Sequence, residues 1–268
     1  MKYLYILLII FVFTSCEDVI NLPLEEGAKR LVIDANINWE KGTSGNEQVI
    51  RLTETSNYYD NLTPAATNAS VIIKNSKNDE FVFTEDGSTG LYKSSAFIPE
   101  INEAYTLEIA YKNETFKATE TLMPITSIDS LKQSVQNIFG TDATRVDFYY
   151  TDPSDEENYY LAEFSSSAYL LNVYRSWRDE FINGNTDNVF EINENLKKDD
   201  ILTLYFYGIS EDYHNYITLL LQQIEPGGPF ATPPAALNGN CINTTKPENK
   251  PLGYFRLSEV VTTTYTIE

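Results

Sequence analysis

The sequence predicts a mainly β protein with a single α-helix. Short runs in which apolar and polar residues alternate recur along most of the chain, with turn-forming residues between them. This spacing is typical of antiparallel strands, whereas one segment alone repeats its apolar residues at the spacing of a helix. The 19 tyrosines and 14 phenylalanines supply the bulky side chains that such a core needs.

The first half of the chain contains six strand-like runs separated by polar turns such as Asp86-Gly87. The series ends at Met123-Pro124, which we interpret as a domain boundary. Strands this short, at this spacing, favour an antiparallel sandwich over a parallel sheet with crossover helices. We therefore expect an immunoglobulin-like β-sandwich over residues 30–123. The runs are 31–37, 48–53, 69–74, 80–84, 105–111 and 115–119.

The second half, residues 124–268, is predicted to be a β-rich domain with one helix near 211–225. Residues 145–151, 158–174 and 201–207 are aromatic and β-branched, as in strands. Ser210 is a suitable helix N-cap, and two acids follow it at the positive end of the helix dipole. The apolar residues at helical spacing are Tyr213, Tyr216, Ile217, Leu220, Leu221 and Ile224.

The first 15 residues have the features of a signal peptide. Lys2 precedes an unbroken apolar run over 3–13, which is much shorter than the roughly 20 residues of a spanning helix. Phe13-Thr14-Ser15-Cys16 resembles the lipobox of bacterial lipoproteins, which implies cleavage before Cys16 and lipidation of its thiol. Residues 16–29 would then form a tether. A plain secreted protein and a transmembrane anchor are the alternatives, and the acids after Cys16 count against the anchor.

The charge balance excludes one class of partner. The net charge is −20, and removing the signal peptide removes Lys2 and no acid, so the mature chain carries −20 − 1 = −21. Such a surface repels nucleic acid and anionic lipid. If lipid occupies Cys16, Cys241 has no cysteine to pair with, so the fold must depend on its hydrophobic core instead of a disulfide.

Few residues could carry catalytic chemistry. His214 is the only histidine, and it lies beside the apolar stripe of the predicted helix, where a partly solvated position is expected. Cys241 has no neighbouring base, which favours an inert thiol. No phosphate loop, paired-cysteine motif or zinc-protease motif is present. A hydrolase would therefore have to use two of the 39 acids, and the sequence does not single out a pair.

Calcium is the one cofactor for which the sequence offers candidates. Asp152, Asp155 and Glu156 crowd one turn, and carboxylate oxygens are the ligands that calcium prefers. The spacing is not that of an EF-hand loop. Acidic residues are also common in turns without a metal, because Asp side chains accept hydrogen bonds from the nearby backbone. We therefore expect that this turn binds no metal, with calcium as the alternative.

The stretch over 226–251 is expected to be a partner-binding loop. It holds six of the eleven prolines, so neither a helix nor a central strand can pass through it. Long loops without regular structure are usually functional or disordered. Phe230 and Leu237 are apolar anchors, and Asn240 is a further candidate contact; disorder is the alternative.

Five segments in a fixed order resemble a family of Bacteroidota lipoproteins of unknown function, DUF4249. The resemblance begins at Cys16-Glu17-Asp18 and continues with Arg30-Leu31-Val32-Ile33-Asp34. It covers essentially the whole mature chain and departs from the family only over 240–250. The remaining segments are Phe148-Tyr149-Tyr150-Thr151-Asp152-Pro153 with Asn158-Tyr159-Tyr160, Arg178 to Gly184, and Pro229-Phe230 with Leu252-Gly253-Tyr254-Phe255.

This resemblance implies a lipoprotein of the outer membrane, often encoded beside a TonB-dependent transporter. Glu17 and Asp18, directly after the lipidated cysteine, resemble a signal for display on the cell surface. We therefore expect a non-catalytic accessory of such a transporter, which captures cargo or closes the mouth of the transporter. A structural or assembly subunit of an outer-membrane complex is the second hypothesis, and a carboxylate-dependent hydrolase is the third.

Overall fold

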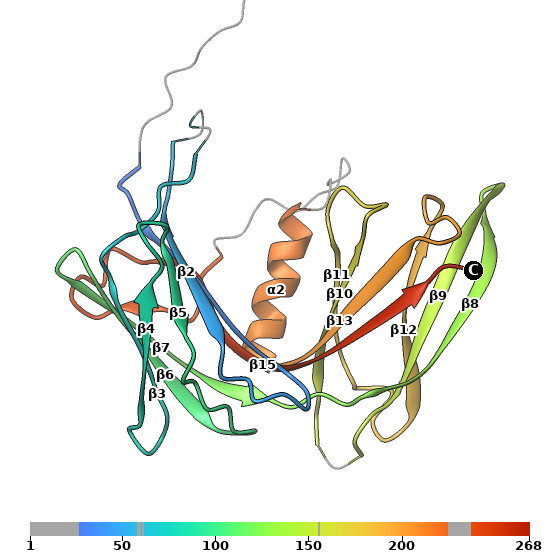
Figure 1. Ribbon diagram of the computed structural model, residues 1–268, viewed down its shortest axis with the longest axis horizontal. Helices are drawn as coiled ribbons and strands as arrows, with labels where there is room; N and C mark the ends of the chain where they lie inside the picture. The colour runs from blue at the N-terminus through green and yellow to red at the C-terminus, as the bar shows by residue number, and fades with distance from the viewer. Residues whose placement is uncertain (1–26, 58–59, 61, 155, 225–236) are drawn as a thin grey trace, which may run out of the picture.

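The computed structural model describes residues 27–57, 60, 62–154, 156–224 and 237–268. Within these ranges the protein is mainly β, with fifteen strands and one helix. Two β units lie side by side and share strand β15, Leu252–Thr266 (Figure 1). The expectation of a mainly β chain with one helix is confirmed for the described residues, but the strands are arranged differently from a simple sandwich.

The first unit is a closed ring of eight hydrogen-bonded strands, which we call the N-terminal ring. The order is β15-β1-β2-β5-β4-β3-β6-β7, and a parallel pairing of Leu122 with Leu257 joins β7 back to β15. An open sandwich would leave edge strands unpaired, and closing the ring satisfies their backbone groups. The seven other strands are β1 Leu31–Glu40, β2 Gln48–Glu54, β3 Ser70–Lys74, β4 Glu80–Glu85, β5 Leu91–Ser94, β6 Ala104–Tyr111 and β7 Glu114–Met123.

The core of the N-terminal ring follows from alternation along its strands. In β1, Ile33 and Ile37 are fully buried, whereas Asp34 between them faces solvent. β6 alternates in the same way, with Tyr105 and Ile109 inside. Because successive side chains of a strand point to opposite faces, this period of two puts one apolar row from each strand inside the ring.

The second unit packs two sheets around an aromatic core. Strands β10 and β11 extend the long sheet beyond β13, which pairs with the second half of β15. A separate three-stranded sheet covers one face of this extension, and Phe148, Phe164 and Phe206 are fully buried between the layers. The strands are β8 Ile128–Ile138, β9 Thr141–Thr151, β10 Tyr159–Ser166, β11 Val173–Arg178, β12 Thr186–Asn193 and β13 Ile201–Ile209.

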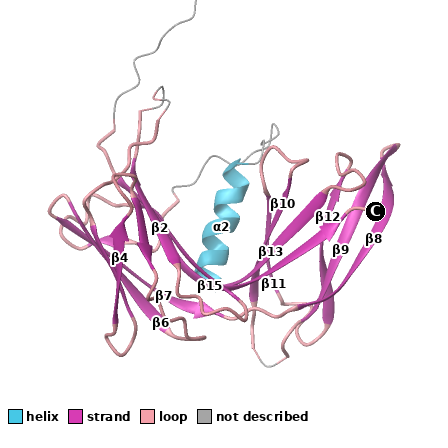
Figure 2. Ribbon diagram, viewed as in Figure 1, coloured by secondary structure: helices cyan, strands magenta, loops and turns pink. Residues whose placement is uncertain are grey.

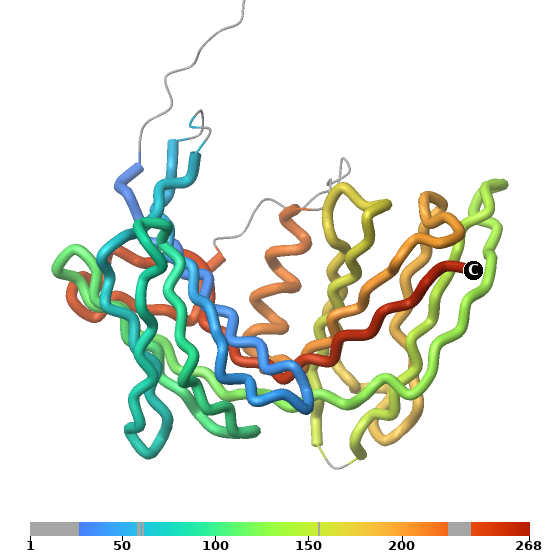
Figure 3. Tube along the Cα trace, in the orientation of Figure 1, coloured from blue at the N-terminus to red at the C-terminus, as the bar shows by residue number. Residues whose placement is uncertain are grey.

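The two units are not consecutive pieces of the chain. The chain leaves the N-terminal ring after β7, which ends at Met123, but it returns. Strand β14, Ile242–Asn243, pairs with β7, and Cys241 and Phe255 are buried in the core of the ring. Figure 3 shows the red C-terminal segment running from the ring to the far side of the second unit. Strand periodicity does not say which sheet a late strand will join, so this return was not predicted.

Helix α2, Glu211–Ile224, lies on the concave side of the long sheet, between the two units (Figure 2). Its bounds match the predicted helix near 211–225. The backbone amide of Tyr213 donates to the Ser210 hydroxyl over 3.2 Å, so Ser210 is the N-cap as expected. Tyr213 and Ile217 face the sheet and are buried.

Candidate functional site

The concave face around α2 carries two grooves, one on each side of the helix. The first, which we call the loop-side groove, separates α2 from residues 237–240 and has a volume of about 380 Å³. The second, the hairpin-side groove, lies between the C-terminal end of α2 and the β10–β11 turn and has a volume of about 660 Å³. The loop-side groove is lined by Asp212, Asn215, Tyr216, Leu219, Leu237, Asn238, Gly239, Asn240 and Tyr254.

Aromatic rings fix the position of α2 on the sheet. The ring of Tyr254, on β15, lies 4.9 Å from that of Tyr213 and 4.8 Å from that of Tyr216. On the other side of Tyr213, the buried guanidinium of Arg256 lies 5.1 Å from its ring and 4.5 Å from the ring of Tyr207. These ring and cation contacts form a rigid floor beneath the helix.

Glu120, on β7, connects the start of α2 to β15. Its Oε2 accepts hydrogen bonds from the Ser210 hydroxyl over 3.0 Å and from the Tyr254 hydroxyl over 3.2 Å. Burial raises the pKa of the Glu120 carboxyl above its usual range, although these hydrogen bonds act against the shift. Burial also raises the pKa of the Tyr254 hydroxyl, which therefore stays protonated and donates.

His214 is half-buried on α2 and hydrogen-bonded, and the sequence had suggested a partly solvated helix position. Its Nδ1 lies 2.7 Å from the Ser176 hydroxyl, which itself donates to the carbonyl of Tyr160 over 3.0 Å. The Ser176 proton is thus used, so Nδ1 of His214 carries a proton and donates. Burial, and then the charge of Arg178, lower the pKa of His214. In this arrangement the imidazole does not activate the serine.

The expected partner loop is partly a structural element. Phe230 lies outside the described residues. Leu237 lines the loop-side groove, as a contact residue would. Asn240 also bonds to β15 through both atoms of its side-chain amide: Nδ2 donates to the carbonyl of Phe255 over 2.8 Å, and Oδ1 accepts from the Phe255 amide over 2.9 Å. Asn240 is therefore a clamp that holds the returning chain against β15, and its role as a partner contact stays a prediction.

Cys241 is inert, as its sequence context suggested. It is buried in the core of the N-terminal ring, and burial raises the pKa of its thiol to about 12. The thiolate, which is the reactive form, is therefore scarce at neutral pH.

The turn that suggested calcium is held together by protein hydrogen bonds. Asp152 is buried, and its carboxylate accepts from the Tyr160 hydroxyl and, over 3.0 Å, from the Gly184 amide. Glu156 is exposed, and Asp155 lies outside the described residues. Across the described part of the chain, no three His, Cys, Asp or Glu residues come together as a metal site would require. Asp152 thus pins the β9–β10 link to the 178–184 segment, and calcium at this turn stays a prediction.

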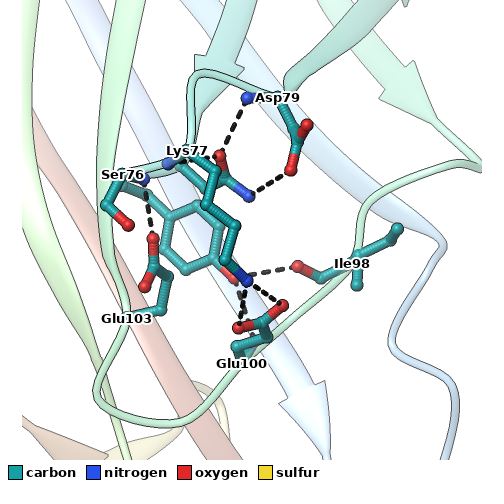
Figure 4. Close-up of polar contacts among 8 residues, drawn as sticks. Ser76, Lys77, Asp79, Ile98, Glu100 and Glu103 are labelled. Atoms are coloured by element: carbon teal, nitrogen blue, oxygen red, sulfur yellow. Dashed lines mark hydrogen bonds and ion pairs between the residues drawn. The ribbon is translucent and has the colours of Figure 1, made fainter.

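A dense polar cluster on the N-terminal ring has a structural explanation (Figure 4). Oδ1 of Asn75 accepts from the amides of Lys77 and Asp79, which closes the turn between β3 and β4. Glu103 accepts from the amide of Ser76 over 2.6 Å, and Lys77 pairs with Glu100 at 3.3 Å. Each residue labelled in the figure makes a contact within the cluster, so this cluster braces the turn.

Sequence reasoning missed the turn that forms one wall of the hairpin-side groove. Residues 158–174 read as a single strand, but the chain turns back between β10 and β11. The signal was the run Ser165-Ser166-Ser167, whose hydroxyls favour turns. Leu219 and Leu171 were also missed as groove residues, because apolar residues in a periodic segment are normally assigned to the core.

The residues expected to anchor and export the protein, Cys16, Glu17 and Asp18, lie outside the described residues. In the part of the chain that the structure describes, no helix combines the length and the apolar character needed to cross a bilayer.

The fold and its site define a two-unit β protein that carries a helix in its concave face. The chain belongs to the DUF4249 family, a domain of unknown function, whose model matches residues 17–264. This confirms the resemblance stated from the sequence. None of the curated proteins matches the chain.

Solved structures resemble this chain only distantly. A two-domain fibronectin type-III segment of chicken tenascin is 8% identical, covers 61% of this chain and 85% of its own, and has a TM-score of 0.21. A mutant Salmonella alpha-2-macroglobulin is 8% identical, with coverage of 91% and 15% and a TM-score of 0.26. A DUF4785 family protein from Legionella pneumophila is 10% identical, with coverage of 66% and 52% and a TM-score of 0.21. This chain therefore spans only 15% and 52% of the latter two, and at such TM-scores no argument rests on any of the three.

Proposed function

We propose that this protein is a lipid-anchored outer-membrane protein, displayed on the cell surface, that serves a TonB-dependent transporter as a non-catalytic accessory. Cys16 would carry the lipid, and Glu17 with Asp18 would direct display. The transporter as partner follows from the family resemblance. The observation that carries a binding role is the concave face, where Leu219 of α2 is 44% exposed beside the loop-side groove.

The chemistry around the groove supports binding over catalysis. The side chains that line the loop-side groove are mostly amides and apolar groups, and Asp212 is the one carboxylate among them. The groove therefore lacks the two facing acids that a glycosidase needs. Ser176 donates its proton to the carbonyl of Tyr160, and Nδ1 of His214 donates to Ser176, so both protons are used in structural hydrogen bonds. A partner loop that enters this groove would bury Leu219 and Leu237 and hydrogen-bond to the amides of Asn215 and Asn238.

We also propose that the N-terminal ring is a modified immunoglobulin-like sandwich. Strands β1, β2, β5 and β15 form one layer, and β3, β6 and β7 form the opposite layer over the same core. The β4–β5 and β7–β15 pairings would be the modification that closes it.

The test of the accessory role is capture of the lipidated full-length chain from native outer membranes, followed by mass spectrometry. We expect a TonB-dependent transporter to copurify. Leu219→Arg, which places a charge in the loop-side groove, should reduce its yield several-fold. Gln222→Arg is the matched control, because Gln222 is exposed on the same helix and lines neither groove.

Two results would contradict the proposal. Capture of envelope-assembly machinery without a transporter would favour the structural subunit instead. Equal yields from Leu219→Arg and the wild type would remove the loop-side groove as the contact.

A further inference from the structure

Strand β8 forms an open edge at the rim of the molecule (Figure 2). It is an outer strand of the three-stranded sheet, and within the described residues it pairs with β9 alone. Alternate residues of an edge strand direct their amide and carbonyl groups away from the sheet, where a further strand can pair with them. At 11 residues, β8 is longer than edge strands usually are.

The other two outer strands of the second unit are bridged to each other. Strand β11 ends the long sheet, and β12 ends the three-stranded sheet on the side away from β8. The guanidinium of Arg175, on β11, donates to the carbonyl of Phe190 and to the carboxylate of Glu191, both on β12. Among the described residues, no side chain makes such a bridge to the backbone of β8.

Strand β8 carries little of the charge that usually protects an edge from pairing. The chain holds 39 acids and 19 bases, but only Asp129 and Lys132 lie in β8. Asp129 lies at an irregularity in the pairing with β9. Residues 130–138 therefore form a regular edge on which Lys132 is the single charged side chain.

The apolar residues of this edge are placed symmetrically about Gln133. Leu131 and Val135 lie two residues before and after it, on the same face of the strand, and are 36% and 65% exposed. In an antiparallel pair, residues directly opposite one another share a face of the sheet. A second copy related by a two-fold axis at Gln133 therefore places Leu131 of each copy opposite Val135 of the other.

Neighbouring registers with the same symmetry fit less well. A shift of the second copy by two residues in either direction would put Leu131 and Val135 opposite polar or charged residues. In the register centred on Gln133, Lys132 lies opposite Ser134 of the second copy, so no like charges face each other directly. The sequence of β8 is therefore complementary to itself in one antiparallel register.

We propose that a second copy of this chain pairs with β8 in the antiparallel register centred on Gln133. The pairing joins two three-stranded sheets into one sheet of six strands, in which residues 130–136 of the two copies lie side by side. Strand β8 lines neither groove beside α2, so both grooves stay open in each copy.

The pairing is weak and depends on salt. Two strands of this length bury less surface than a permanent dimer needs. The side-chain amide of Gln133 also bonds to the backbone of Glu268 in its own copy, which brings the two Glu268 residues near the two-fold axis. Because salt screens their repulsion and that between the two acidic chains, added salt should favour the dimer.

The test uses the mature chain, 16–268, with Cys16→Ser and single cysteines introduced into β8. Gln133→Cys places two thiols directly opposite one another, at a separation that a disulfide can span. Val135→Cys is the matched control, because it lies on the same face and is more exposed, but its two thiols would be roughly 13 Å apart along the strands. Cys241 does not compete, because it is buried and its thiol pKa is raised to about 12.

A mixture of Leu131→Cys and Val135→Cys tests the register without changing Gln133. Under mild oxidation we expect several-fold more disulfide-linked dimer from the mixture than from either variant alone, and several-fold more from Gln133→Cys than from Val135→Cys. Thermal melts establish that each variant is folded.

Sedimentation of the chain without introduced cysteines gives the second measurement. We expect an average mass that rises above one chain with protein concentration and with salt. Ser134→Glu, which faces Lys132 of the second copy, should strengthen the dimer, and Ser134→Lys should weaken it. A mass of one chain at every concentration would overturn the proposal and leave this edge to a strand of another protein. Equal cross-linking from Gln133→Cys and Val135→Cys, or a mixture no better than its components, would also overturn it.

Discussion

At the scale of single residues, buried polar groups connect the site to its surroundings. Glu120, Tyr254 and Ser210 link β7, β15 and α2, and Arg256 rests between two tyrosine rings. Such groups are stable in an apolar environment only when their hydrogen bonds are satisfied. The position of α2 therefore depends on a few polar contacts as well as on apolar packing.

Glu120 should make the stability of the protein depend on pH. Its pKa is raised by burial above the ordinary value of 4.5, so the folded state holds this proton at pH values where the unfolded state has lost it. The contribution of Glu120 to stability therefore falls as pH rises from 4.5 through the raised pKa. Glu120→Gln removes this titration, so its stability, measured by urea unfolding, should decline less than that of the wild type over that range.

Glu114 is a control for this prediction, because its pKa is shifted in the opposite direction. The hydrogen bond from Lys246 lowers the pKa of the Glu114 carboxyl, so its contribution is present above 4.5 and is lost as pH falls through the lowered pKa. Glu114→Gln should therefore lose stability relative to the wild type at neutral pH.

If the free energies of unfolding of Glu120→Gln and the wild type changed with pH in the same way, Glu120 would not be buried as described.

At the scale of elements, the segment after α2 is fixed to β15 through close backbone contact. A Cβ on Gly239 would lie 1.6 Å from the carbonyl oxygen of Gly253, and Gly253 itself has a φ of +90°. Only glycine permits both the close approach and this backbone conformation. The two hydrogen bonds of Asn240 then hold the segment in register.

Replacing this clamp should destabilise the protein. Asn240→Ala removes both hydrogen bonds and leaves the Phe255 amide and carbonyl unpaired, which costs about 1–3 kcal/mol. Asn238→Ala, two residues earlier on an exposed position, should change the free energy of unfolding by less than about 0.5 kcal/mol. Chemical denaturation measures the free energy of unfolding of both variants. If both substitutions changed it by the same small amount, the segment would be held in some other way.

The elements show where sequence reasoning succeeds. Helix α2 was predicted because its cap at Ser210 and its apolar period are both local signals. The β10–β11 hairpin was missed because Tyr169-Leu170-Leu171 continues a strand-like run, and its apolar turn conflicts with the usual polar composition of turns. The clamp role of Asn240 was likewise not predictable, since its partner Phe255 is 15 residues away and no local pattern joins them.

At the scale of the whole molecule, β15 makes the two units interdependent. Its first half supplies Phe255 and Leu257 to the core of the N-terminal ring, and its second half pairs with β13 in the other unit. The overall β class was predicted from periodicity. The closed ring was not, because closure depends on pairings between β15 and strands more than a hundred residues away.

This arrangement predicts that the first domain drawn from the sequence cannot fold alone. A fragment over 17–123 lacks β15, so β1 and β7 would each expose an unpaired edge and the core would lose two large side chains. We expect no cooperative thermal transition from this fragment, whereas 17–268 should show one. A cooperative melt of the short fragment would mean that the ring is independent of the returning strand.

We propose that lipid on Cys16 holds this fold at a membrane, and the intact mass of the mature protein isolated from outer membranes measures that lipid. We expect a chain that begins at residue 16 and carries a diacylglyceryl group on that cysteine, with the remaining mass equal to residues 16–268. A mature chain that begins at another residue, or that has an unmodified thiol at position 16, would rule out the lipid anchor.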